Sequence, residues 1–277
     1  MFTNTKLCIL FCIGIIFTGC ISENKKTALK FEPVSSKVYM PDSNYNKDLG
    51  EWKKYYEQCT KKDLFPDAYY LQLQDKIYIG SINNEQANDI NNGTNILDTS
   101  NGKSPFNIMS VINSSNCTDT IQLSDKLKTA FFKEVVDALN TSPEFKSLVS
   151  VIDAGDMTII TGSLYSTALI KDSLINILNS TRDSSLIIYK ELLLKPENVL
   201  LAETIEVMGF RAEFSLKAKL SDFLRKQLVR EVFPDNKTSK VFRSLVLLSS
   251  NRLRIVIDKR FTVLGRFLQL KVDEKTD

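Results

Sequence analysis

The 277-residue sequence contains no histidine. Histidine is the commonest general base near neutral pH and the commonest zinc ligand, so its absence excludes Ser–His and Cys–His nucleophile pairs and histidine-based zinc sites. The sequence also lacks a G-x-S-x-G turn, a P-loop and a dinucleotide-binding glycine motif. Catalysis by two carboxylates needs none of these groups, but no spacing singles out a pair among the 33 Asp and Glu residues. We therefore expect a protein that is not an enzyme and holds no cofactor.

Long apolar runs are absent except near the N-terminus. Residues 7–17 form an eleven-residue apolar stretch, which is shorter than the ~20 residues that a membrane-spanning helix needs. A lysine precedes this stretch, and Thr18 and Gly19 separate it from Cys20. This layout is typical of a secretory signal peptide, which we predict to occupy residues 1–19. An uncleaved N-terminal anchor is the alternative.

The sequence Ile-Phe-Thr-Gly-Cys that ends at Cys20 resembles the lipobox of bacterial lipoproteins, with Phe17 in the place where leucine is usual. The resemblance implies that the Cys20 thiol receives a diacylglyceryl group and that cleavage makes Cys20 the N-terminus, whose amine is often acylated with a fatty acid such as palmitate. Two or three acyl chains hold a protein stably at a membrane, whereas one chain does not. Because Ile21 is not aspartate, the resemblance favours the outer membrane, on its periplasmic or its surface-exposed face.

Cysteine is scarce in the rest of the chain, where only Cys59 and Cys117 occur. An even pair of cysteines in an exported protein indicates a disulfide. A bond between them would stabilise the fold by about 4 kcal/mol in the chain-entropy model. Two separate buried thiols are the alternative.

Acidic residues are scarce in one part of the C-terminal half. From Arg211 to Lys271 there are 15 Lys and Arg but only 5 Asp and Glu, although the whole chain has a net charge of +3. Such segregation favours a surface that binds something anionic. The candidate binding residues on this basic face are Lys217, Lys219, Arg252 and Arg254. The expected partner is a protein or an anionic polymer of the envelope, and not nucleic acid; a solvated face without a partner is the alternative.

The spacing of apolar residues predicts an α+β fold, in which amphipathic helices pack on one or more antiparallel sheets. Residues 20–49, which are polar and contain two prolines, are expected to form a flexible tether. Residues 50–277 then form the globular body, with two lobes divided near residue 120 as an option. Helical spacing predicts helices over 51–59 and 125–140, the second capped by Ser124.

Other helix and strand signals lie in the second half of the chain. Proline followed by glutamate predicts further helix starts at residues 143 and 196, the second helix ending at Gly209. Strict alternation predicts a strand over 210–220, followed by a helix from residue 222, and three β-favouring runs predict a C-terminal meander. Asp153 and Asp156 flank a glycine, which is more typical of a turn than of a metal site.

The order of a helix, "FKSLVSV" and then "GDMTIITGSL" resembles part of the periplasmic α/β domains of the curli-secretion-channel lipoprotein and of the Tol-system propeller protein. The resemblance implies an alternative function as a subunit of an oligomeric secretion channel. The strand over 210–220 is long enough for a transmembrane β-strand, but a helix follows it instead of a hairpin partner. A carboxylate-dependent cell-wall hydrolase is the third option. We expect a lipid-anchored protein with a binding or assembly role.

Overall fold

The computed structural model describes most of the chain after the first 27 residues. It describes residues 28–34, 43–74, 79–84, 94–97, 109–141, 145–180, 184–229 and 242–273, together with Pro143 and Arg182. Within these residues an 11-stranded antiparallel sheet is covered by helices, so the predicted α+β class is confirmed. The predicted signal peptide and Cys20 lie outside the described residues. None of the helices described here combines the length and the apolarity that crossing a membrane requires.

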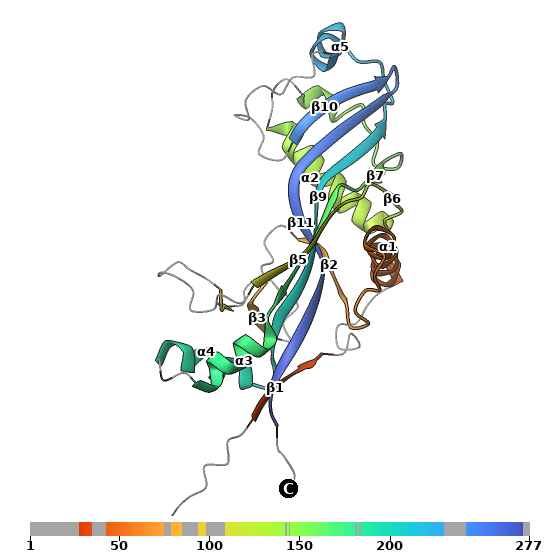
Figure 1. Cartoon of the computed structure of the whole chain (residues 1–277). Coiled ribbons are helices and arrows are strands. Elements are labelled where there is room, and N and C mark those ends of the chain that lie inside the picture. The colour runs from red at the N-terminus through yellow and green to blue at the C-terminus, as the bar shows by residue number, and fades with distance from the viewer. Residues whose placement is uncertain are drawn as a thin grey trace, which may run out of the picture.

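Two very long strands form the axis of the molecule (Figure 1). β9 (Asn198–Ser215) has 18 residues and β11 (Arg252–Asp273) has 22, which correspond to about 60 and 70 Å of extended chain. They pair antiparallel, with Arg252 opposite Ser215 at one end of the pairing and Leu268 opposite Leu200 at the other. The molecule is therefore elongated along these two strands.

The shorter strands attach to this pair, and every pairing is antiparallel. Those that pair with β11 are β1 (Ala28–Pro33), β2 (Tyr69–Gln74) and β10 (Phe242–Ser249). Those that pair with β9 are β3 (Ser81–Asn84), β7 (Thr158–Ile160) and β8 (Ser163–Leu169). At the margins, β4 (Thr94–Asn95) pairs with β3, β5 (Met109–Asn116) with β8 and β6 (Thr120–Ile121) with β7.

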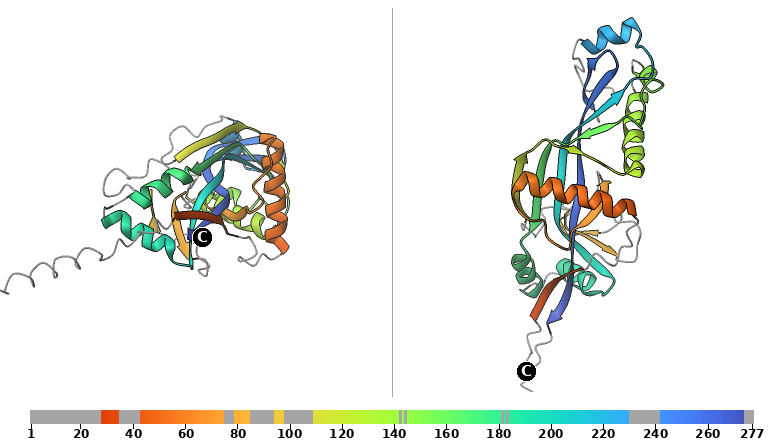
Figure 2. Two further views of the ribbon diagram at one scale, coloured as in Figure 1. Left: turned by 60° about the horizontal axis from the view of Figure 1, so that its bottom comes forward. Right: turned by 90° about the vertical axis from the view of Figure 1, so that its right-hand side faces the viewer.

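The helices cover different parts of the two axial strands (Figure 2). They are α1 (Ser43–Thr60), α2 (Asp125–Asn140), α3 (Lys171–Ser180), α4 (Ser184–Leu194) and α5 (Asp222–Val229), with a 3-10 turn, η2 (Lys146–Leu148). α3 and α4 lie beside β1 and the chain end, and α5 lies at the opposite end of the molecule (Figure 1). We call α5 and the adjoining ends of β9, β10 and β11 the tip. We call β1, α3, α4 and the adjoining ends of β9 and β11 the proximal end.

Aromatic packing holds α1 and α2 against the axial strands. The ring of Phe210 on β9 contacts Trp52 of α1, Phe131 of α2 and Phe261 of β11, with centroids 5.1–6.1 Å apart. Phe210 is fully buried and Trp52 nearly so. Aromatic side chains of this size contribute much of the apolar burial in a core. α1 and α2 are therefore parts of one core with the upper sheet, although they lie on either side of residue 120.

Near the proximal end, both faces of the axial strands are buried. Val199 and Leu201 pack with Phe267 and residues of β2 on one face. Leu200 and Ala202 pack with Leu268 and the apolar residues of α3 and α4 on the other. Consecutive residues of β9 are therefore all apolar here, as expected for a strand that is covered on both sides.

Cys59, at the end of α1, and Cys117, just after β5, form a disulfide, with Cα atoms 5.5 Å apart. The predicted pairing is confirmed in the structure. The hydroxyl of Tyr55 also joins these regions, since it donates to the carbonyl oxygens of Gly162 at 2.7 Å and of Cys117 at 3.1 Å. α1 is thus fixed to the β5–β8 side of the sheet by one covalent bond and two hydrogen bonds.

Several sequence-based expectations need correction. The expected tether over 20–49 contains β1 and the start of α1, because β1 finds a pairing partner in β11. The helix expected over 196–209 is wrong, since residues 198–209 belong to β9. The two last strands of the meander are one strand, β11, and the helix expected from residue 143 is represented by the short turn η2. One sheet joins strands from both sides of residue 120.

Candidate functional site

The four residues of the predicted basic face lie at the tip. Arg252 and Arg254 stand opposite Ser215 and Glu213 in the β9–β11 pairing. Lys217 and Lys219 follow β9 directly. The structure therefore brings Lys217 and Lys219 to the same end of the molecule as Arg252 and Arg254, which are 33–37 positions away in the sequence.

Three of these four residues are engaged in ion pairs. Nη2 of Arg252 lies 3.1 Å from Oε2 of Glu213, and Nε of Arg254 donates to its Oε1 at 2.8 Å. The Glu213 side chain is only 9% exposed, so two arginines compensate one nearly buried carboxylate. The ammonium group of Lys217 pairs with Asp153, and this bond holds the pKa of that carboxyl below its usual range. These three side chains stabilise the tip through ion pairs, so their charges are less available to a binding partner.

The same compensation continues along β11, where a basic residue pairs repeatedly with an acid from earlier in the chain. These pairs are Lys259–Glu134, Arg260–Glu206, Arg266–Glu203, Arg266–Asp67 and Lys271–Glu32. Seven of the 15 Lys and Arg residues between Arg211 and Lys271 are therefore paired with acidic residues of other parts of the fold. The excess of positive charge in the sequence overstates the charge that is free on the surface.

Uncompensated charge at the tip gathers around α5. Lys219, Arg225 and Lys226 are exposed, and no acidic side chain in the described ranges lies within 4 Å of their charged nitrogens. Beside them, the ring of Phe223 is 63% exposed. Leu248, near the end of β10, is 40% exposed. Lys226 shares a helix face with the exposed Phe223 ring, while Arg225 lies on the other flank of the helix. A short helix with an exposed ring and several cations favours an acidic partner with an apolar component.

The local sequence explains why α5 presents this face. Ser221 caps the helix, since its hydroxyl accepts a bond from the amide of Leu224 at 3.3 Å. Leu224 and Leu228 lie one turn apart and are buried, which leaves Phe223 and Lys226 on the solvent side. Phe223, Arg225 and Lys226 were not among the predicted binding residues. The sequence did contain an indication for Phe223. In a short helix whose buried face is formed by Leu224 and Leu228, a phenylalanine next to that face is left exposed to solvent.

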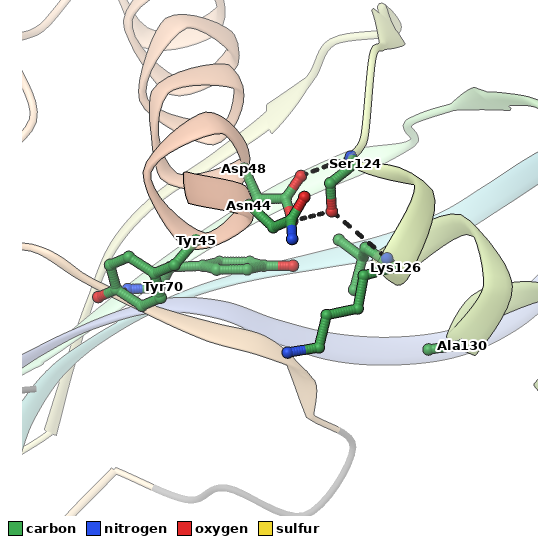
Figure 3. A pocket seen from close by; sticks show the side chains of 8 residues that line it. Asn44, Tyr45, Asp48, Tyr70, Ser124, Lys126 and Ala130 are labelled. Carbon is green, nitrogen blue, oxygen red and sulfur yellow. Dashed lines mark hydrogen bonds between the residues drawn. The ribbon is translucent and has the colours of Figure 1, made fainter. Parts of the chain in front are cut away.

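A second candidate is a cavity of about 100 Å³ between α1, β2 and α2 (Figure 3). Its lining residues are Asn44, Tyr45, Asp48, Tyr70, Ser124, Lys126, Leu127 and Ala130. The carboxylate of Asp48 is buried and accepts bonds from the Ser124 amide at 2.7 Å and from its hydroxyl at 2.6 Å. The same hydroxyl caps α2. Asp48 therefore serves as a link between α1 and α2, and its oxygens are occupied.

Tyr70 is the unusual group in this cavity. Its hydroxyl is buried and makes no hydrogen bond of good geometry with a described residue. Burial and the nearby charge of Asp48 raise its pKa. The indole N–H of Trp52 lies close to this hydroxyl and opposes the rise of its pKa, and it has no other partner among the described residues. The two buried polar groups belong to the core of the protein. Neither of them indicates which ligand could bind in the cavity.

The carboxylate-hydrolase option depends on two close carboxylates with access to a substrate. Asp67 and Glu203 come close, but Arg266 lies between them and donates to both, at 2.8 and 3.0 Å. The Arg266 guanidinium also lies over the ring of Phe65. In the described part of the chain, no group of three or more acidic or cysteine residues could hold a metal ion. The Arg266 cluster has the geometry of a structural ion-pair network.

Comparisons with known proteins give little further information. The sequence matches no protein-family model and no curated protein. Among solved structures, this chain is similar to a bacterial gasdermin from Bradyrhizobium tropiciagri. The match covers 71% of this chain and 79% of that chain, with a TM-score of 0.32 and 12% sequence identity. A TM-score this low supports no conclusion about shared fold or function.

Proposed function

We propose that this protein is a non-enzymatic binding protein of the bacterial cell envelope, attached to a membrane by lipid on Cys20 and contacting an acidic macromolecular partner with its tip. The observation that carries the proposal is the group of Phe223, Lys219, Arg225 and Lys226. Their cations have no acidic partner in the described part of the chain, and the ring of Phe223 on the same helix as two of them is exposed. Lys217, Arg252 and Arg254 support the rim of this surface.

The elongated shape supports the same role. β1, the first described strand, lies at the proximal end, and the tip lies at the other end of strands that are about 60–70 Å long (Figure 1). An anchor near β1 would therefore hold the tip well away from the membrane surface. The layout suits a protein that reaches toward a partner, and attraction through the tip should weaken as salt screens the charges.

A photocrosslinking amino acid at position 223 tests the proposal in intact cells. We expect one discrete adduct with a macromolecule. The triple variant Lys219→Glu, Arg225→Glu, Lys226→Glu should abolish this adduct, because it reverses the three free charges without removing a described ion pair. Folding should persist, since all three side chains are exposed.

The matched control is Lys47→Glu, Lys54→Glu, Lys146→Glu, which changes net charge equally at exposed positions of α1 and η2. The control variant should keep the adduct. Absence of any adduct from position 223, or equal loss in both triple variants, would contradict a binding surface at the tip.

A further inference from the structure

Exposed large apolar side chains are concentrated at the two ends of the described molecule. Phe223 and Leu248 lie at the tip, and the others are Ile170, Ile187, Ile188 and Val272 at the proximal end. Ile170 joins β8 to α3, and Val272 stands beside β1 in the pairing with Leu29. The proximal end is therefore the more apolar of the two surfaces.

α4 carries the most exposed part of this surface. The helix, "SSLIIYKELLL", is apolar on nearly every side. Leu186 and Leu193 are buried toward the sheet, whereas Ile187 and Ile188 are 38% and 57% exposed on the side away from it. A helix that is apolar all round normally has apolar neighbours on all sides. Among the described residues, such neighbours lie on only one side of α4.

The length of the chain before β1 identifies what can cover the other side. Only seven residues, 21–27, separate Cys20 from Ala28, the first residue of β1. The Cα atoms of Cys20 and Ala28 can therefore be at most about 28 Å apart. α3 packs beside β1, and α4 packs on β9 and β11 next to it. A lipid on Cys20 would hold this end of the protein at the bilayer surface.

The charges near α4 indicate which kind of contact forms. Residues 170–197 contain four Lys and Arg and four Asp and Glu. Because this segment has no net charge, it is not attracted to anionic headgroups. Isoleucine side chains, in contrast, are stabilised when they are buried from water, whatever the charge of the lipid. The contact must therefore depend on apolar insertion, and it should be insensitive to lipid charge and to salt, unlike binding at the tip.

We propose that Ile187 and Ile188 of α4 insert into the headgroup–acyl boundary of the bilayer that holds the acyl chains of Cys20. The inference rests on the lipid attachment that forms part of the proposed function, and it adds a second membrane contact to it. An acyl anchor and an inserted apolar helix together fix the orientation of the body. The tip then points away from the membrane, whereas an anchor alone would leave the body free to tumble.

A fluorescent label at position 188 tests this contact in the lipidated full-length protein. The variant Ile188→Cys carries an environment-sensitive fluorophore, and Lys54→Cys and Phe223→Cys carry the same label as controls on α1 and at the tip. Each protein is reconstituted into phosphatidylcholine vesicles with and without nitroxide-labelled lipid. We expect a blue shift on membrane binding and strong quenching by nitroxide lipid at position 188 alone, unchanged when phosphatidylglycerol or salt is added.

The outcomes separate this inference from the lipid anchor. Mass spectrometry of Cys20 reports the anchor independently of the label. If Cys20 carries lipid but the label at 188 behaves like the label at 54, the membrane contact is wrong and the anchor stands. A label that is shielded from water but not quenched by nitroxide lipid would mean that protein, such as a second copy, covers α4, and the inference would be overturned. An unmodified Cys20 would overturn both.

Discussion

At the scale of single residues, Gly162 shows how closely β8 and β9 approach each other. A Cβ atom at this position would overlap the carbonyl oxygen of Met208 and lie 2.7 Å from that of Gly209. Gly209 itself has a φ of +78° at the irregular point of the β9–β11 pairing, a conformation that favours glycine. The carbonyl of Gly162 also accepts the bond from Tyr55. Backbone therefore meets backbone here, with no flexible side chain able to move aside.

We expect Gly162→Ala to lower the free energy of unfolding by at least about 2 kcal/mol, because the methyl group forces the two strands apart. Urea unfolding of purified protein measures the change. Gly50→Ala is the matched control, since nothing lies within 4 Å of its Cβ position in α1. That substitution should be neutral or stabilise the helix by up to about 1 kcal/mol. Equal effects of the two substitutions would contradict the close contact.

Glu206 provides a prediction about pH at the same scale. Burial raises its pKa above the ordinary value of 4.5, although the ion pair with Arg260 opposes this shift. A raised folded-state pKa means that the folded protein binds the proton more tightly than the unfolded chain. The contribution of Glu206 to stability is therefore most favourable below pH 4.5. It declines as pH rises through the raised pKa.

The free energy of unfolding of the wild type minus that of Glu206→Gln should therefore fall as pH increases from about 4 toward neutrality. Urea titrations at several pH values measure this difference. Glu32→Gln is a control of opposite sign, because the bond from Lys271 lowers the pKa of Glu32. Its contribution is present above the unfolded pKa and is lost on acidification. If the difference in unfolding free energy between the wild type and Glu206→Gln does not change with pH, the raised pKa of Glu206 is contradicted.

At the scale of elements, the disulfide fixes α1 to a distant part of the chain. Cys59 and Cys117 are 58 residues apart, so the bond closes a long loop in the unfolded chain. We expect the double variant Cys59→Ser, Cys117→Ser to lose about 4 kcal/mol of unfolding free energy. Urea unfolding of the variant should match that of the reduced wild type. If reduction and substitution leave stability unchanged, the bond does not constrain the unfolded state in solution.

The sequence predicts some of these elements well and others badly, for physical reasons that particular residues show. Ser124 and the leucine face of α2 are local signals, and the helix has the predicted bounds. Pro196 and Gly209 were read as helix signals, yet they flank most of β9. The apolar run after Pro196 is buried on both faces, and periodicity alone cannot distinguish such a strand from a buried helix. Gly209 lies at an irregular point of the β9–β11 pairing and does not end a helix.

The candidate site shows a similar limit. The excess of Lys and Arg after residue 211 indicated a basic face, but the partners of Arg252 and Arg254 depend on strand register. Only the register between β9 and β11 reveals that Glu213 lies against both arginines. Residues so distant in sequence carry no local sign of their pairing. The cations without an acidic partner in the described ranges, Lys219, Arg225 and Lys226, can be distinguished only when these ion pairs are known.

At the scale of the whole molecule, the two ends differ in chemistry. The tip combines free cations with one exposed ring, whereas the proximal end is apolar with balanced charge. Between the tip and the proximal end, most basic residues of β11 form ion pairs with acidic residues of other strands. This arrangement suits a molecule that contacts one surface with each end.

The proposed lipid anchor gives the last prediction. Cys20→Ser should release the protein from the membrane fraction of cells, because no other described segment could hold it stably: two exposed isoleucines offer less than one acyl chain, which alone binds only reversibly. Detergent-phase partitioning and mass spectrometry of the N-terminus measure the effect. The double variant Cys59→Ser, Cys117→Ser should remain in the membrane fraction, which separates lipid attachment from disulfide formation. A Cys20→Ser protein that stays with membranes at the wild-type level would mean that the body has a stronger membrane contact than α4 provides. In that case the orientation proposed for the tip would have to be assigned anew.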